Sequence, residues 1–171
     1  MSGILDPGGV IDALFSVLQA NLAAKFNVLD TEYGDSIVLN DVASTDYWRA
    51  FLGNYDSFPC IVAVTEVTIP EDQAAAFWIQ THTVALSFYE TSIEAVDSLL
   101  PPEVAVVRVQ RSLRAIQEVI VANQTLTVSA VDKAMFCGID GIAYGAVEDT
   151  PDSQFIYAGT LNLQITVNYK G

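Results

Sequence analysis

Strict alternation of apolar and polar residues runs from Thr160 to Tyr169, near the end of the chain. Alternation of this kind is typical of an extended strand that turns one side toward a core. The other side of this strand holds only Asn, Gln and Thr, so it is polar but carries no charge. Such a side suits a sheet face that meets other protein. The alternative is an ordinary solvated face, which is common in antiparallel sheets. The apolar side is made by Leu161, Leu163, Ile165, Val167 and Tyr169.

The first third of the chain predicts one helix followed by irregular structure. Asp6 and Pro7 suit a helix start, and apolar residues then recur at helical spacing to roughly Lys25. The segment from Ser36 to Leu39 is compatible with a short strand. An aromatic cluster beyond it favours a short packed helix over the alternative, a loop that becomes ordered on a partner. Its residues are Tyr47, Trp48, Phe51 and Leu52.

The middle of the chain predicts two paired strands. The β-branched run from Cys60 to Thr68 and the alternating run from Gln80 to Tyr89 are natural antiparallel partners. The connection between them, Ile69 to Ile79, is too long for a tight hairpin. Its apolar end, which includes Phe77 and Trp78, either extends the strands or docks onto another surface.

A second helix and more strand sequence complete the chain. Apolar spacing predicts the helix from Glu103 to about Asn123. Val128 to Val147 is typical of two strand pieces interrupted by glycines, and Glu148 to Ser153 is typical of a surface turn. Together with the final strand, this order predicts an α+β fold, an antiparallel sheet with two main helices packed on one face.

A basic stripe lies on the second predicted helix. Arg108, Arg111 and Arg114 recur at a spacing of three and supply three of the seven Lys and Arg residues in a chain of net charge −14. One interpretation is a solvated helix face supported by the nearby Glu103 and Glu118. The other is contact with an acidic neighbouring surface, for example that of a second subunit.

Composition narrows the class of protein. With 171 residues, of which 51% are hydrophobic and 16% charged, the chain is expected to fold as one domain spanning residues 1–171. Cys60 and Cys137 lie in apolar contexts and are expected to be buried thiols in a reducing compartment. The absence of any Cys-x-x-Cys or Cys/His cluster argues against a zinc site. The excess of acidic residues disfavours nucleic-acid binding, which depends on cationic side chains.

Sequence motifs for catalysis are lacking. The lone histidine, His82, lies in a predicted strand and is most simply a partly buried structural residue. No nucleophile-elbow, phosphate-loop, dinucleotide-binding or zinc-protease motif occurs. No apolar run reaches the length of a membrane span. We therefore expect neither an enzyme nor a cofactor-binding protein nor a membrane protein.

The order of elements points to a family. Phe58-Pro59 enters a β-branched strand, a long connection leads to a strand ending in Phe88-Tyr89-Glu90, and a helix precedes the closing Leu-x-Leu-x-Ile-x-Val-x-Tyr. In this order and pattern the chain resembles the tail terminator (tail completion) proteins of long-tailed bacteriophages. The resemblance is best from Phe58 to Tyr169, with the N-terminal helix also in its expected place. It rests on pattern and not on an invariant motif. Residues 40–57 look longer than in compact members and are expected to be an insertion.

The resemblance implies an α+β subunit that assembles into a six-membered ring. Such a ring caps the finished tail tube, ends tail polymerisation and joins the tail to the head connector. The implied partners are further copies of the chain, the tail tube protein and the connector or neck protein, while DNA passes the lumen without specific binding. The subunit is expected in the host cytoplasm during assembly and in the virion, at the tail–neck junction, afterwards.

Two alternatives to the terminator role stay open. One is another neck or tail-tube subunit, and the other is a small-molecule-binding or enzymatic α+β domain. The residues expected at subunit or partner interfaces are Arg108, Arg111, Arg114, Phe77, Trp78, Tyr47 and Trp48.

Overall fold

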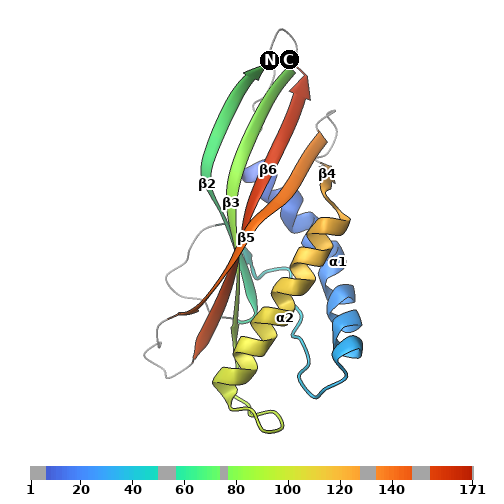
Figure 1. Cartoon of the computed structure of the whole chain (residues 1–171), viewed down its shortest axis with the longest axis vertical. Coiled ribbons are helices and arrows are strands. Elements are labelled where there is room, and N and C mark those ends of the chain that lie inside the picture. Colours follow the sequence, from blue (N-terminus) through green and yellow to red (C-terminus); the bar gives the residue numbers. More distant parts are fainter. Residues whose placement is uncertain (1–6, 50–56, 74–76, 128–133, 148–154, 171) are drawn as a thin grey trace.

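The computed structural model describes residues 7–49, 57–73, 77–127, 134–147 and 155–170. Within these ranges the strands form one sheet in the order β1-β2-β3-β6-β5-β4. The two helices lie side by side across one face of it (Figure 1). The elements are α1 (Pro7–Tyr33), β1 (Tyr47–Trp48), β2 (Cys60–Gln73), β3 (Phe77–Thr91), α2 (Pro101–Ala122), β4 (Thr125–Thr127), β5 (Ala134–Val147) and β6 (Ile156–Lys170).

The strand predicted from strict alternation becomes a central strand of the sheet. β6 lies between β3 and β5 and pairs antiparallel with both. All other neighbours are antiparallel as well, except β1, which runs parallel to β2. The α+β prediction, with an antiparallel sheet and two helices on one face, is thus confirmed, and the parallel β1 is an addition to it. That residues 1–171 form one domain with an insertion at 40–57 stays a prediction.

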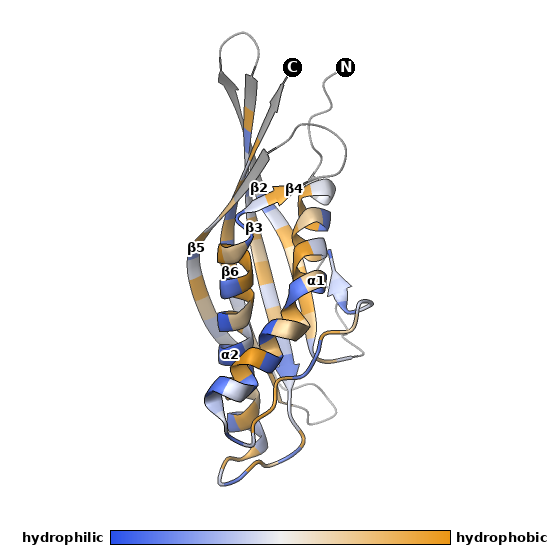
Figure 2. Ribbon diagram, turned by 90° about the vertical axis from the view of Figure 1, so that its right-hand side faces the viewer, coloured by the Kyte–Doolittle hydropathy of each residue, from blue (hydrophilic) through white to orange (hydrophobic). Residues whose placement is uncertain are grey.

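The core lies between the sheet and the helix layer. Figure 2 shows both helices on the same side of the sheet, above hydrophobic strand segments. At Gly159 the approach is so close that a Cβ would lie 2.2 Å from Leu113 Cδ1, so only glycine fits without repacking. The fully buried walls of this core include Leu161, Leu163, Ile165 and Val167 from β6 and Val109, Leu113, Ile116 and Ile120 from α2.

Helix α1 is longer than the sequence predicted. It continues past Lys25 to Tyr33, because Phe26 and Leu29 extend its apolar stripe into the core. The helix ends at Gly34, whose φ of +62° is the left-handed conformation that commonly terminates helices.

The segment between α1 and β2 differs from both short elements predicted there. Ser36 to Leu39 pairs with no strand among the described residues; it belongs to an irregular connection, residues 34–46, which we call the strap. Tyr47 and Trp48 form β1 and not a helix, because their backbones pair with those of residues 61 and 62. The other two members of the aromatic cluster, Phe51 and Leu52, lie outside the described residues.

The connection between β2 and β3 is shorter than predicted. The two strands run on to Gln73 and Phe77, which pair with each other, so most of Ile69 to Ile79 extends the hairpin. Residues 74–76 lie outside the described residues, as do 128–133 and the turn predicted at 148–153. The ends of β2, β3 and β6 that lie near the hairpin turn extend beyond the helices (Figure 1).

Candidate functional site

Arg111, in the middle of the basic stripe, is largely buried, with 12% of its side chain exposed. Its Nη1 donates to Asp35 Oδ1 at 2.8 Å and to the carbonyl oxygen of Ile37 at 3.2 Å. The guanidinium lies 3.9 Å from the centroid of the Tyr33 ring, a cation–π contact. The hydrogen bonds from Arg111 lower the pKa of Asp35 to about 2, so this pair is ionised at neutral pH.

Arg108 and Arg114 hold the same region on either side of Arg111. Arg114 donates to Glu32 and to Glu118, both at 2.8 Å. Arg108 Nε donates to the carbonyl oxygen of Val38 at 3.0 Å. The stripe therefore fastens the end of α1 and the first half of the strap onto α2.

The acidic neighbours of the stripe are thus found within the same chain. They are Glu32, Asp35 and Glu118, of which only Glu118 was a predicted partner. Glu103 instead accepts a hydrogen bond from the backbone N–H of Leu100 at 2.8 Å, where it stabilises the start of α2. A contact between the stripe and another subunit stays a prediction, but these ion pairs remove the need for one.

A buried carboxylate, Glu90 of β3, lies beneath the strap at 1% exposure. Asn40 Nδ2 donates to Glu90 Oε2 at 3.3 Å, and the N–H of Thr91 donates to Oε1 at 3.1 Å. Desolvation raises the pKa of Glu90 to about 7, against the opposing attraction of Arg108. Sequence reasoning missed this residue, although the alternation that buries Phe88 places Glu90, two residues later, on the same side.

The four aromatic residues predicted at an interface do not form one surface. Tyr47 packs on the helix side, with its ring 5.3 Å from that of Phe15. Trp48 packs against a small cluster on the opposite side of the sheet. Phe77 and Trp78 begin β3 and pair with both β2 and β6, while their side chains lie outside the described part of the structure.

On the sheet face opposite the helices, which we call the helix-free face, the described side chains carry charge only at the two bulged positions, Glu66 and Asp140. Near its centre Ser87 Oγ and Thr160 Oγ1 are 2.7 Å apart and share a hydrogen bond. So few charges among the described side chains of one face are unusual on a chain with 21 acidic residues. Its side chains include Cys60, Val62, Val64, Thr83, Ala85, Ser87, Tyr89, Ala143, Ala158, Thr160, Asn162, Gln164 and Thr166.

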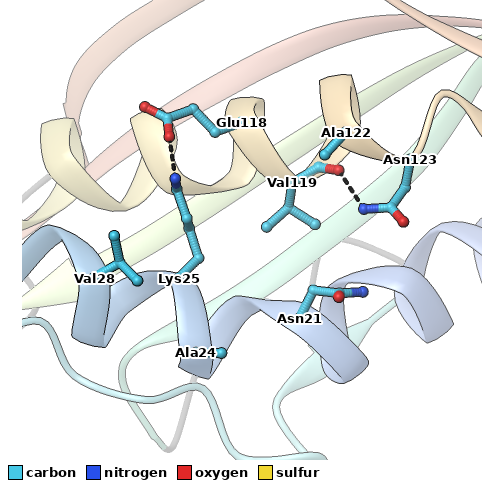
Figure 3. Close-up of a pocket in the computed structure, with 8 residues that line it drawn as sticks. All are labelled: Asn21, Ala24, Lys25, Val28, Glu118, Val119, Ala122 and Asn123. Carbon is cyan, nitrogen blue, oxygen red and sulfur yellow. Dashed lines mark hydrogen bonds and ion pairs between the residues drawn. The ribbon is translucent and has the colours of Figure 1, made fainter.

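A shallow groove separates the outer sides of the two helices (Figure 3). Lys25 of α1 and Glu118 of α2 form an ion pair across it. Asn123 Nδ2 turns back to the carbonyl oxygen of Val119 at 2.8 Å. Its polar side chains thus bond to the protein itself, and the groove offers no convergent set of groups for catalysis.

The side chains best suited to catalysis or metal binding, one histidine and two cysteines, are buried. His82 is buried on the helix side of β3, where desolvation lowers its pKa. Cys60 and Cys137 are free, buried thiols, as predicted, and burial raises the pKa of each to about 12. Within the described ranges no group of His, Cys, Asp and Glu is arranged to hold a metal ion. No helix in these ranges is long and apolar enough to cross a membrane.

Comparison with known proteins identifies the fold. No family model and no curated protein matches this chain. A chain of the virion of the native gene transfer agent (GTA) particle has a similar structure, with a TM-score of 0.51 and 13% sequence identity. The alignment covers 96% of each of the two chains. At this identity the likeness establishes a shared fold from end to end.

Proposed function

We propose that this protein is a non-enzymatic structural subunit of a phage-type virion. The observation that carries the proposal is the fold shared with a chain of the gene transfer agent virion over 96% of both chains. The order and pattern of the sequence reach the same class of protein by a separate route, through the resemblance to tail terminator proteins. Partners in such a particle are further virion proteins, including copies of this chain.

Within that class we propose the tail terminator role, a six-membered ring that caps the tail tube and joins it to the head connector. A net charge of −14 suits a ring through which DNA slides, because like charges repel and prevent binding. The helix-free face, whose described side chains carry few charges, suits a contact surface, since acidic copies otherwise repel one another. The expected location is the tail–neck junction of the virion.

Another neck or tail-tube subunit is the second candidate. The end-to-end fold match supports it equally, because a shared fold does not specify a position in the particle. The two candidates differ in what the protein does to a growing tube. A terminator adds once, at the end, whereas a tube subunit adds repeatedly.

The deciding experiment polymerises the tail tube protein of the same virus with and without this protein. At elevated salt we expect rings of six copies by native mass spectrometry. By negative-stain microscopy we expect tubes that carry one ring at the end and stop growing. Tubes that lengthen by incorporating the protein would assign it to the tube. Protein that neither forms rings nor binds tubes would overturn the virion proposal.

A pair of matched variants tests the helix-free face in the same assay. Gln164→Lys adds a charge to that face, and Gln110→Lys adds the same charge to the exposed side of α2. If the face is a contact surface, only Gln164→Lys lowers the fraction of rings. Equal behaviour of the two variants would remove the face from the proposal.

A further inference from the structure

The two lateral edges of the sheet are open along most of their length. β1 covers only Ile61 and Val62 of β2, and β4 covers only Ala134 to Phe136 of β5. Among the described residues, the N–H of Cys137 still donates to the carbonyl oxygen of Gln124, but no strand pairs with the outer side of residues 63–73 or of residues 138–147. Open edges of this kind present rows of backbone N–H and C=O groups that can pair with a strand of another chain.

Each open edge carries a β-bulge whose extra residue is a carboxylate. The register of β2 on β3 skips Glu66, and the register of β5 on β6 skips Asp140. Both side chains are exposed. Bulges and charged side chains are the devices by which proteins prevent pairing between sheet edges.

Apart from Asp140, the edge formed by β5 has few features that would prevent it from pairing with a strand of another chain. The strand, Ala134–Val147, contains no other charge and no proline. At Gly141 and Gly145 a Cβ would meet no atom within 4 Å, and neither residue has a positive φ. The packing of this chain therefore does not require glycine there. Glycine in a strand interior often marks the close approach of another backbone.

We propose that the two open edges pair with each other between copies of this chain, β2 of one copy against β5 of the next, and that Glu66 and Asp140 are gatekeepers that hold free subunits apart. The directions fit: β2, β3, β6 and β5 alternate, so a second β2 beside β5 continues the antiparallel sheet. The lengths also fit, because the open segments, residues 63–73 and 138–147, hold eleven and ten residues. This inference rests on the proposed function, and names the contact that closes the ring.

The contact joins two different surfaces, which is the arrangement that can close into a ring. A symmetric contact between two β5 edges would leave β2 open. The β2 edge carries three acidic residues and a proline, at Glu66, Pro70, Glu71 and Asp72. Pairing therefore brings like charges together, and it needs screening by salt or an additional surface such as the end of a tail tube.

Substitutions at Asp140 test the gatekeeper role by sedimentation velocity and native mass spectrometry. At low salt we expect a mostly monomeric wild type. Asp140→Asn should lower the concentration for half-association by about two- to fivefold, the usual scale for one exposed charge pair. Asp140→Lys should lower it further, because the lysine attracts the acidic β2 edge. Added salt should promote association of the wild type and weaken that of Asp140→Lys.

Glu94→Lys is the matched control, since it makes the same change in net charge at an exposed carboxylate outside the strands. It should leave association close to wild type. An equal gain from Glu94→Lys, a fully associated wild type at low salt, or an Asp140→Asn variant no different from wild type would overturn the gatekeeper role. If Asp140→Lys does not fold, Asp140→Asn and Glu66→Gln provide the same test.

Hydrogen exchange locates the contact. In the associated state, backbone amides of residues 63–73 and 138–147 should both gain protection. Protection of 138–147 alone, together with dimers, would replace the proposed pairing with a symmetric one. Tubes capped by rings whose edges stay unprotected would refute the pairing and leave the terminator role intact. Rings whose edges are protected but which do not bind tubes would refute the terminator role and leave the pairing intact.

Discussion

The two faces of the sheet use the same strands in opposite ways. Under the helices, Leu161, Leu163 and their neighbours are fully buried, and the buried carboxylate of Glu90 accepts a hydrogen bond from Asn40 of the same chain. On the helix-free face the strands present hydroxyls, amides and small side chains. At the two edges of the sheet, residues 63–73 and 138–147 have no partner strand within the described part of the chain.

Comparing the two faces of the sheet changes which feature of this acidic chain suggests contact between copies. The concentrated basic stripe draws attention, yet its arginines bind acidic groups and carbonyls of the same chain. The uncharged polar side of β6, which the sequence already indicated as a possible contact surface, belongs to the helix-free face. Because copies of net charge −14 repel one another, uncharged surfaces are where they approach at the lowest electrostatic cost.

The largest expected effect comes from placing a charge on each side of β6. Leu163→Asp buries an unpaired carboxylate and should destabilise the fold by about 3–5 kcal/mol or more, enough to abolish soluble folding. Gln164→Asp places the same charge on the exposed side and should change stability by about 0.5 kcal/mol or less. Thermal unfolding followed by circular dichroism compares them. Equal melting temperatures would mean that the two faces are not distinct.

Glu90 on the covered side gives a pH-dependent effect. Its pKa is raised from 4.5 to about 7, so between these values the folded state holds a proton that the unfolded state has released. Stability therefore falls as pH rises from about 4.5 to 7, and the cost is complete above pH 7.

Glu90→Gln should remove that cost. We expect the variant to be about 1–3 kcal/mol more stable than wild type at pH 8 and close to wild type at pH 4.5. Denaturant unfolding across this pH range measures the difference. A wild type and variant with parallel pH profiles would show that this carboxylate does not titrate with folding.

Substitutions at two glycines compare how closely the covered and the open parts of the sheet are packed. Gly159→Ala pushes a methyl group against Leu113 of α2 and should cost about 1–3 kcal/mol through overpacking. Gly145→Ala on β5 meets no atom within 4 Å, so the melting temperature should hold or rise slightly. The reverse ranking would mean that α2 does not press on the sheet at this point.

The smallest effect is expected at the basic stripe. Arg111→Ala removes the contacts to Asp35, Ile37 and Tyr33, and should lower the melting temperature by a few degrees. Arg111→Lys should restore only part of it, because an ammonium cannot reproduce the planar guanidinium contacts. Loss of ring formation with an unchanged melting temperature would instead place Arg111 between subunits.

Much of the fold can be predicted from local sequence patterns, without knowledge of the tertiary structure. The alternation from Thr160 to Tyr169 predicts a strand with one buried side, and the spacing of Val109, Leu113 and Ile116 predicts the buried side of α2. The periods of two and of about 3.6 residues are properties of the backbone itself. The sequence alone therefore determines these elements, their buried sides and the α+β class.

The contacts that organise the candidate surfaces are not local. Arg111 and Asp35 are 76 residues apart in sequence, and Asn40 and Glu90 are 50 apart. No periodic pattern connects such pairs, so the stripe was open to either an internal or an external partner. The internal partners became apparent only from the packing of the end of α1 against α2.

Which strands form the edges of the sheet is also decided only by the tertiary structure. Whether a strand is central or open depends on which strands lie beside it, and the order β2-β3-β6-β5 does not follow the order in sequence. The bulges at Glu66 and Asp140 exist only as mismatches between paired strands. Side-chain period is a short-range property that the sequence carries by itself, whereas strand order, register and the burial of Glu90 depend on contacts that form only when distant segments meet.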